Sequence, residues 1–142
     1  MKKTAGIHHI TAIVGHPQEN VDFYAGILGL RLIKKTVNFD DPGTYHLYFG
    51  DDGGKPGTII TFFPWAGAAQ GKIGGGQVGV TTYAIPVGTL FYWENRLAKF
   101  AIPFNTFIAG LTFLATLIAL FSFTFLWMSR ILNAWLILTP LK

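Results

Sequence analysis

The chain has 142 residues, enough for one domain of ordinary size or for a smaller unit with an appended segment. Its net charge of +4 is modest and its lysines and arginines form no dense basic run, so the sequence indicates no nucleic-acid-binding track. The absence of cysteine excludes disulfides, thiolate metal sites and cysteine nucleophiles. The N-terminus starts with lysines but lacks the long apolar core of a signal peptide, so we expect a cytoplasmic protein.

The first half of the chain predicts a strand, a helix and three further strands. Residues 6–14 are rich in β-branched side chains and end at a Gly-His-Pro turn, as a buried strand would. Residues 18–28 carry apolar side chains at helical spacing, and Gly29 then ends the helix. This order indicates an α+β fold with a βαβββ module. The three further strands are expected at residues 32–38, 45–49 and 58–63, separated by turns rich in Asp, Gly and Pro.

A second copy of the pattern begins after the glycine-rich residues 71–76. A strand and an aromatic-bearing helix recur at an offset of roughly 70 residues, which aligns Pro17 with Pro86 and Leu28 with Leu97. The copy should continue into three strands with turn residues, but it meets an apolar tail instead. We therefore expect a first module at residues 1–70, the start of a second and incomplete module at 71–105, and an apolar, helical tail at 106–142.

The tail differs in composition from everything before it. Residues 100–129 contain no charged side chain, and residues 107–128 are long and apolar enough to cross a bilayer as a helix. Two interpretations remain open. The tail is either a membrane helix with Trp127 and Trp135 as interfacial anchors, which would place the chain in contact with a membrane, or sequence that has left the reading frame of the modules before it.

A family resemblance rests on three segments: HHITA, DFYAGILGLRLIKKTVNFDDPGTYHLYFGD and GKPGTIITFFPW. Together they resemble the opening of the ring-cleaving hydroquinone dioxygenases of the vicinal oxygen chelate superfamily, which also contains glyoxalase I and bleomycin-resistance proteins. The resemblance covers residues 1–105. It implies paired βαβββ modules around a metal, usually Fe(II) with Mn(II) as the alternative, that binds a hydroquinone or catechol beside dioxygen. It also implies one histidine ligand on the first strand, and a second histidine and a glutamate in later modules.

Two neighbouring histidines at the first strand are the candidate site residues. Side chains alternate between the two faces of a strand, so His8 and His9 should point in opposite directions from an undistorted strand. The resemblance favours His9 as a metal ligand, on the face shared by Ile7, Thr11 and Ile13. It leaves His8 as a catalytic residue that moves protons or orients a ligand. On spacing alone, a hydrogen-bonded strand histidine beside an exposed one remains the alternative.

The other polar candidates are expected to be structural. His46 should pack, on the face opposite Tyr45 and Leu47, and His16 should be exposed in its turn. The neighbouring carboxylates of Asp40 and Asp41 precede Pro-Gly, which favours the capping of a turn over metal binding.

The second copy lacks the ligands that the resemblance implies. The position that matches His9 is Val78 or, one residue out of register, Gln77, and no acidic residue follows Glu94. Non-haem Fe(II) in oxygenases is typically held by two imidazoles and one carboxylate. The sequence therefore predicts an incomplete metal site. Either another chain completes this site, or this chain does not turn over substrate.

Three functions remain open. The first is the N-terminal part of a metal-dependent ring-cleaving dioxygenase that acts on a small aromatic diol. The second is a metal-free small-molecule binder of the glyoxalase/bleomycin-resistance type, and the third is a membrane-anchored product without activity. Modules of this superfamily pair within or between chains, so each function is compatible with a homo-oligomer. The binder would use the aromatic side chains of Tyr45, Phe62, Phe63 and Trp65.

Overall fold

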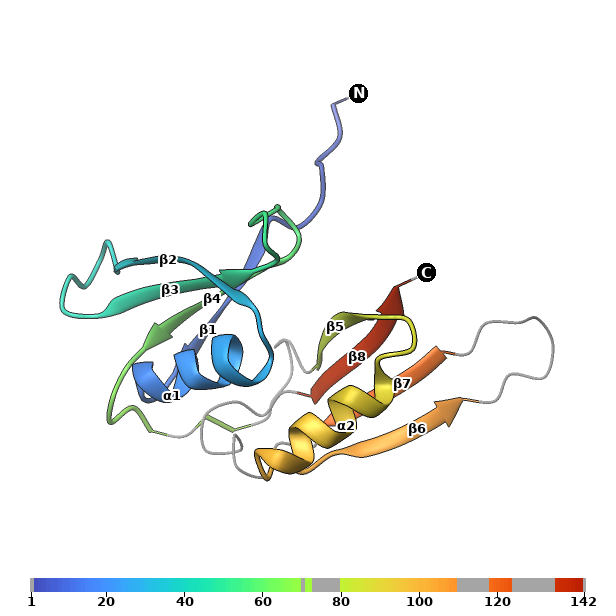
Figure 1. Ribbon diagram of the computed structural model, residues 1–142. Helices are drawn as coiled ribbons and strands as arrows, with labels where there is room; N and C mark the ends of the chain where they lie inside the picture. The colour runs from blue at the N-terminus through green and yellow to red at the C-terminus, as the bar shows by residue number, and fades with distance from the viewer. Residues whose placement is uncertain (1, 70, 73–79, 110–117, 124–134, 142) are drawn as a thin grey trace. The chain divides into compact units, whose positions relative to one another are not determined.

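The structure is a computed structural model that describes residues 2–69, 71–72, 80–109, 118–123 and 135–141. The chain forms two compact units, Met1–Ala69 and Gln70–Lys142. Each unit contains a four-stranded mixed sheet and a helical segment between its first two strands (Figure 1).

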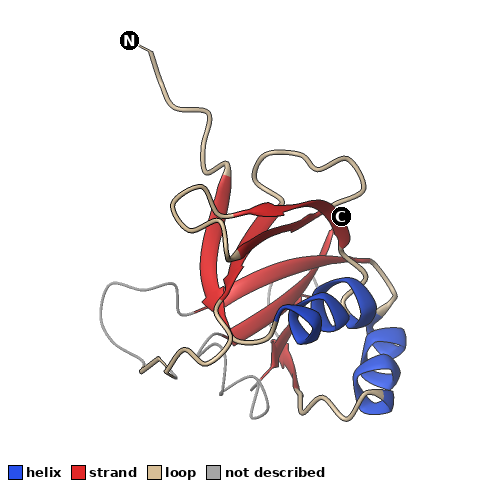
Figure 2. Cartoon of the chain, turned by 90° about the vertical axis from the view of Figure 1, so that its left-hand side faces the viewer, coloured by secondary structure: helices blue, strands red, loops and turns tan. Residues whose placement is uncertain are grey.

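Unit 1 is a βαβββ module, as the sequence predicts. The order of its strands in the sheet is β1-β4-β3-β2; β1 runs parallel to β4, and the other neighbours are antiparallel. Figure 2 shows the strands in red and the helices in blue. The elements are β1 His9–Val14, α1 Pro17–Val21, η1 Asp22–Ile27, β2 Arg31–Val37, β3 Tyr45–Gly50 and β4 Ile59–Pro64.

The helical segment of unit 1 has a start and an end that its sequence explains. Pro17 occupies the first helical position, and the imidazole of His16 accepts a hydrogen bond from the Gln18 amide at 3.3 Å, which satisfies a free amide of the first turn. The helix then widens into a π-turn, in which the Leu28 amide bonds the Phe23 carbonyl at 2.9 Å. Gly29 ends it with a φ of 72°, a conformation that glycine adopts without strain.

The core of unit 1 lies between this helical segment and one face of the sheet. Tyr24 of η1 packs on the rings of Phe62 and Phe49, with centroid distances of 4.5 and 5.4 Å. Because side chains alternate along a strand, the residues next to these core residues in the sequence point to the opposite face of the sheet. The largest fully buried side chains of unit 1 are Phe49, Phe62, Leu47 and Thr61.

Unit 2 repeats the order of elements of unit 1. Its strands are arranged β5-β8-β7-β6, with β5 parallel to β8. Leu97 of α2 is completely buried, and Ile85 and Ile102 are buried with it in the core of the unit. The elements are β5 Val80–Pro86, α2 Leu90–Lys99, β6 Asn105–Ala109, β7 Ile118–Phe123 and β8 Trp135–Leu141.

The predicted helical tail is wrong wherever the tail is described. Within residues 107–128, the described parts belong to strands β6 and β7, and β8 follows them; residues 110–117 and 124–134 lie outside the described residues. A continuous apolar run does not distinguish a helix from a buried strand by its periodicity, which explains the error. Among the described residues, no helix is long and apolar enough to span a membrane.

Candidate functional site

One face of the unit 1 sheet carries polar and aromatic side chains instead of core residues. It is the face of the sheet opposite the helical segment. Along β1, β3 and β4, the side chains on this face alternate with the side chains that point to the helix. We call it the open face. Its side chains that matter here are Lys34, His9, Thr11, His46, Tyr48, Thr61 and Phe63.

The two histidines at the start of β1 lie beside each other. Their Nδ1 atoms are 3.0 Å apart, and their rings meet edge to face with centroids 5.2 Å apart. The expectation that they point in opposite directions is wrong, because β1 begins at His9 and the alternation of faces does not extend to His8. The His8 backbone is held by its carbonyl, which accepts from the Gly57 amide at 2.8 Å. Both imidazoles are exposed.

A chain of hydrogen bonds crosses the open face from β1 to β3. Thr11 Oγ1 and Thr61 Oγ1 are 2.8 Å apart, and Thr61 Oγ1 lies 3.0 Å from His46 Nε2. The other ring nitrogen of His46, Nδ1, lies 3.0 Å from the Tyr48 hydroxyl. The strand register creates this chain, since Thr61 pairs with Thr11 on one side and with Tyr48 on the other. His46 therefore uses both of its nitrogens.

Aromatic rings accompany the hydrogen bonds. The His46 ring lies between those of Phe63 and Tyr48, with centroid distances of 4.1 and 4.2 Å. The Tyr48 ring is 6.5 Å from the His9 ring, and the Lys34 ammonium lies 5.5 Å from the Tyr48 centroid. Burial lowers the pKa of His46, and the nearby positive charges of His9 and Lys34 lower it further. His46 is thus held as a neutral imidazole at neutral pH.

Some sequence expectations for this region are confirmed and others are wrong. His16 is exposed, and Asp41 accepts a hydrogen bond from Thr44 Oγ1, as the turn interpretation expects. His46 is packed between rings, but it also links two strands through hydrogen bonds. Tyr48 and Thr61 were not predicted as site residues. Alternation places Tyr48 on the face of His46, so the spacing of two residues was the available signal.

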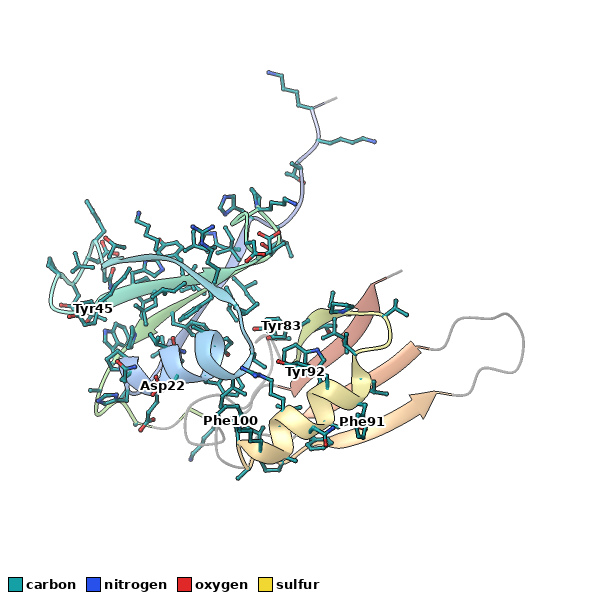
Figure 3. All side chains as sticks on the ribbon, in the orientation of Figure 1. Asp22, Tyr45, Tyr83, Phe91, Tyr92 and Phe100 are labelled. Carbon is teal, nitrogen blue, oxygen red and sulfur yellow. The ribbon has the colours of Figure 1, made fainter. Side chains whose placement is uncertain are left out.

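The four aromatic residues expected to form one binding surface do not do so. Phe62 is completely buried in the core, while Phe63 lies on the open face. Tyr45, labelled in Figure 3, lies at the start of β3 with the Lys35 ammonium 4.4 Å from its ring centroid. Trp65 follows β4, and its indole Nε1 donates to Thr44 Oγ1 at 2.9 Å. Adjacent strand residues such as Phe62 and Phe63 cannot share a face.

The described residues do not by themselves fit a resident Fe(II). They contain no group of three or more His, Cys, Asp or Glu side chains that could hold a metal ion. His9 offers one exposed imidazole with that of His8 beside it, which falls short of the two imidazoles and one carboxylate that non-haem Fe(II) typically uses.

Comparison with known sequences identifies a family. The profile of the Glyoxalase/Bleomycin resistance protein/Dioxygenase superfamily matches residues 6–106. The chain is 78% identical over 104 residues to "Putative ring-cleaving dioxygenase MhqO" of Bacillus subtilis, covering 73% of this chain and 33% of that protein. It is 45% identical over 103 residues to "Chlorohydroquinone/hydroquinone 1,2-dioxygenase" of Sphingobium indicum, covering 71% of this chain and 32% of that protein. The chain thus spans about a third of the length of these relatives.

Solved structures share the fold. A crystal structure of a "putative dioxygenase" from Bacillus subtilis superimposes with a TM-score of 0.82 at 58% identity, covering 100% of this chain and 42% of that one. A glyoxylase/bleomycin resistance protein/dioxygenase domain from Frankia superimposes with a TM-score of 0.69 at 18% identity, covering 99% of this chain and 94% of that one. The second likeness concerns the fold alone.

Proposed function

The chain belongs to the Glyoxalase/Bleomycin resistance protein/Dioxygenase superfamily, and we propose that it supplies the first βαβββ module of a metal-dependent ring-cleaving dioxygenase for small aromatic diols. The observation that carries the proposal is the placement of His9. Its imidazole is exposed at the start of β1, beside a second imidazole, within residues 6–106 that the superfamily profile matches. The name of the Sphingobium relative supports a hydroquinone as the substrate.

In this proposal His9 is one metal ligand and His8 is a catalytic residue. The metal is Fe(II) or Mn(II), and its remaining ligands come from residues other than those described, in a further module or in a second chain. The two Nδ1 atoms are 3.0 Å apart, so the His8 ring lies beside the His9 ring, and the other ring nitrogen of His8 would pass a proton to, or accept one from, a group bound next to His9. Such chemistry needs a fuller ligand set than the described residues provide.

Metal content tests the ligand role of His9. A single imidazole lacks the chelate advantage and the charge compensation of a carboxylate, so the full chain should retain far less than one Fe(II) or Mn(II) per molecule after dialysis. His9→Ala should remove what remains. The matched control is His16→Asn, which keeps an N-capping side chain at α1 and should retain the wild-type amount. Stoichiometric metal that disappears on His9→Ala would show that a second subunit or unidentified residues complete the site.

Oxygen uptake tests the proposed reaction. The full chain, supplied anaerobically with Fe(II) and then given air and hydroquinone, methylhydroquinone or catechol, should consume no oxygen above background. A chimera in which residues 1–105 replace the matching part of the Bacillus relative should consume oxygen. His9→Ala in the chimera should abolish uptake and metal binding, whereas His8→Ala should slow uptake and leave the metal content nearly intact. A chimera that keeps its activity with His9→Ala would contradict the proposal.

A metal-free small-molecule binder is the second candidate. The stack of Phe63, His46 and Tyr48 on the open face favours it, because these rings offer an aromatic ligand a surface without any metal. Binding of hydroquinone to the full chain in excess EDTA, measured by calorimetry, distinguishes the two candidates. Tight binding in EDTA together with an inactive chimera would favour the binder.

A further inference from the structure

We propose that Tyr48 is the group on the open face that hydrogen-bonds the oxygen of a phenolic ligand, and that His46 and Thr61 are positioning residues that allow Tyr48 to act as either donor or acceptor. The inference rests on the proposed function, since it assigns a phenolic ligand to the same face. The evidence is the hydrogen-bond chain from Thr11 through Thr61 and His46 to Tyr48.

The two ends of this chain can meet a ligand, whereas the polar atoms of its two middle residues are already hydrogen-bonded within it. Thr61 is completely buried, and both nitrogens of His46 are engaged. Neither residue can therefore take up a ligand directly. Thr11 is exposed and Tyr48 is half-buried, so these two side chains are the ones at which a ligand can hydrogen-bond to the chain. The hydrogen-bonding state of one end depends on the other through the two residues between them.

The chemistry of a neutral imidazole gives the chain two arrangements. One ring nitrogen carries a hydrogen and donates, while the other accepts. In the first arrangement Tyr48 donates to Nδ1 of His46, and Nε2–H donates to Thr61; the Tyr48 oxygen can then accept from a ligand. In the second, Thr61 donates to Nε2, and Nδ1–H donates to the Tyr48 oxygen, so the Tyr48 hydroxyl hydrogen is available to a ligand. A proton that enters at Tyr48 and leaves at Thr11 converts the first into the second.

The surroundings of Tyr48 favour it over Thr11 as the ligand end. The Lys34 ammonium lies 5.5 Å from its ring centroid and the His9 ring lies 6.5 Å away, so cationic and metal-ligating groups flank the hydroxyl-bearing ring. A phenol has one acidic hydroxyl and an aromatic ring. A positive charge nearby stabilises its phenolate form, and Tyr48 in its second arrangement can donate to that oxygen. The site therefore suits a phenol or phenolate next to His9.

Nuclear magnetic resonance of ¹⁵N-histidine in the full, metal-free chain tests the inference without turnover. Two-bond ¹H–¹⁵N correlations distinguish the Nδ1–H and Nε2–H forms of His46. Titration with hydroquinone under anaerobic conditions should shift the His46 nitrogen signals. Tyr48→Phe keeps the ring stack but should remove this shift and weaken hydroquinone binding roughly two- to tenfold, the worth of one hydrogen bond. The matched control Tyr45→Phe alters a hydroxyl at the start of β3 and should behave like the wild type.

Thr61→Val completes the test. Without its partner at Nε2, His46 should show a changed population of its two forms before any ligand is added, and hydroquinone should no longer change that population. No shift of His46 with hydroquinone at millimolar concentration would overturn the inference, and so would a shift that survives Tyr48→Phe but disappears with Thr11→Val. A normal His46 response combined with an inactive chimera would leave the Tyr48 subsite standing and refute the proposed dioxygenase function.

Discussion

The two units have the same backbone topology but different chemistry. In each unit, the strand that comes first in the sequence pairs in parallel with the strand that comes last, and the other two strands extend the sheet by antiparallel pairing (Figure 1). All four histidines of the chain belong to unit 1, and three of them form the contacts of its open face and of the start of β1. Many different apolar sequences can form the same order of strands, whereas a functional site needs particular side chains at particular positions of the strands.

The helices show the same contrast. Leu28 and Leu97, which the repeat aligns, are both buried, so the alignment marks equivalent core positions. Phe23 is buried in unit 1, whereas Tyr92, which the same offset aligns with it, projects from α2 and is 54% exposed (Figure 3). The guanidinium of Arg96 lies 5.9 Å from the Tyr92 ring centroid on the same helix. The two helical segments thus share a buried leucine near their ends, but they differ in burial at the aligned aromatic position.

The largest expected effect is the loss of the unit 1 core through Phe62→Ala. This ring is completely buried against Tyr24, and its removal leaves a cavity that should lower the free energy of unfolding by about 3–5 kcal/mol. Urea denaturation followed by circular dichroism measures the change. Phe39→Ala serves as the control, because Phe39 is 94% exposed and should change stability by less than about 0.5 kcal/mol. Equal effects of the two substitutions would show that unit 1 lacks the described core.

The matching change in unit 2 is Leu97→Ala. Leu97 is completely buried, so the substitution should cost about 2–5 kcal/mol, while Phe91→Ala on the exposed side of the same helix should cost little. The histidine signals report on unit 1 alone, since that unit contains every histidine. If the two units fold independently, Leu97→Ala lowers the urea midpoint of unit 2 and leaves the nuclear magnetic resonance signals of the histidines unchanged. A collapsed histidine spectrum would show that unit 1 depends on unit 2.

A smaller effect is expected from Thr61→Val, which is nearly isosteric and removes two hydrogen bonds from the centre of the open face. It leaves His46 Nε2 without its partner, which should cost about 1–3 kcal/mol of stability. Thr61→Ser retains the hydroxyl and should cost less, although it removes a buried methyl group. Urea midpoints of the three proteins measure the difference, and a valine variant as stable as the wild type would mean that the chain of hydrogen bonds contributes nothing to folding.

Much of unit 1 could be predicted from its sequence because its signals are local. The expected strand at 45–49 and helix at 18–28 fall within a residue or two of β3 and of the α1–η1 segment, since turns and periodicity mark both. The tail could not be predicted, because a continuous apolar run has no period that separates strand from helix. His8 was misplaced because the first residue of β1 cannot be read to within one position.

The hydrogen-bond chain escaped prediction for a different reason. Thr11 and Thr61 are 50 residues apart in sequence, and they meet only because β1 pairs with β4 in one particular register. Local patterns identify strands and the faces of their side chains, but they do not fix which residues of two distant strands lie opposite each other. The role of Thr61 as a link between Thr11 and His46 is therefore a property of the sheet and cannot be found in either segment alone.

The smallest expected effect is a dependence of stability on pH that comes from His46. Burial, with the charges of His9 and Lys34, lowers the pKa of His46 in the folded protein from the ordinary value of 6.5. The unfolded chain therefore binds more protons at this residue once the pH falls below about 6.5, so protonation favours unfolding. The stabilising contribution of neutral His46 is present above that pH and is lost as the pH falls through the lower, folded pKa.

Urea denaturation at about pH 7.5 and at about pH 5.5 measures this effect. The midpoint should fall more between the two pH values for the wild type than for His46→Gln. His16→Asn should behave like the wild type, because His16 lies outside the hydrogen-bond chain. If the urea midpoint falls equally in the wild type and in His46→Gln, the pH dependence comes from other groups. The burial of a neutral His46 would then not be a feature that distinguishes unit 1 from unit 2.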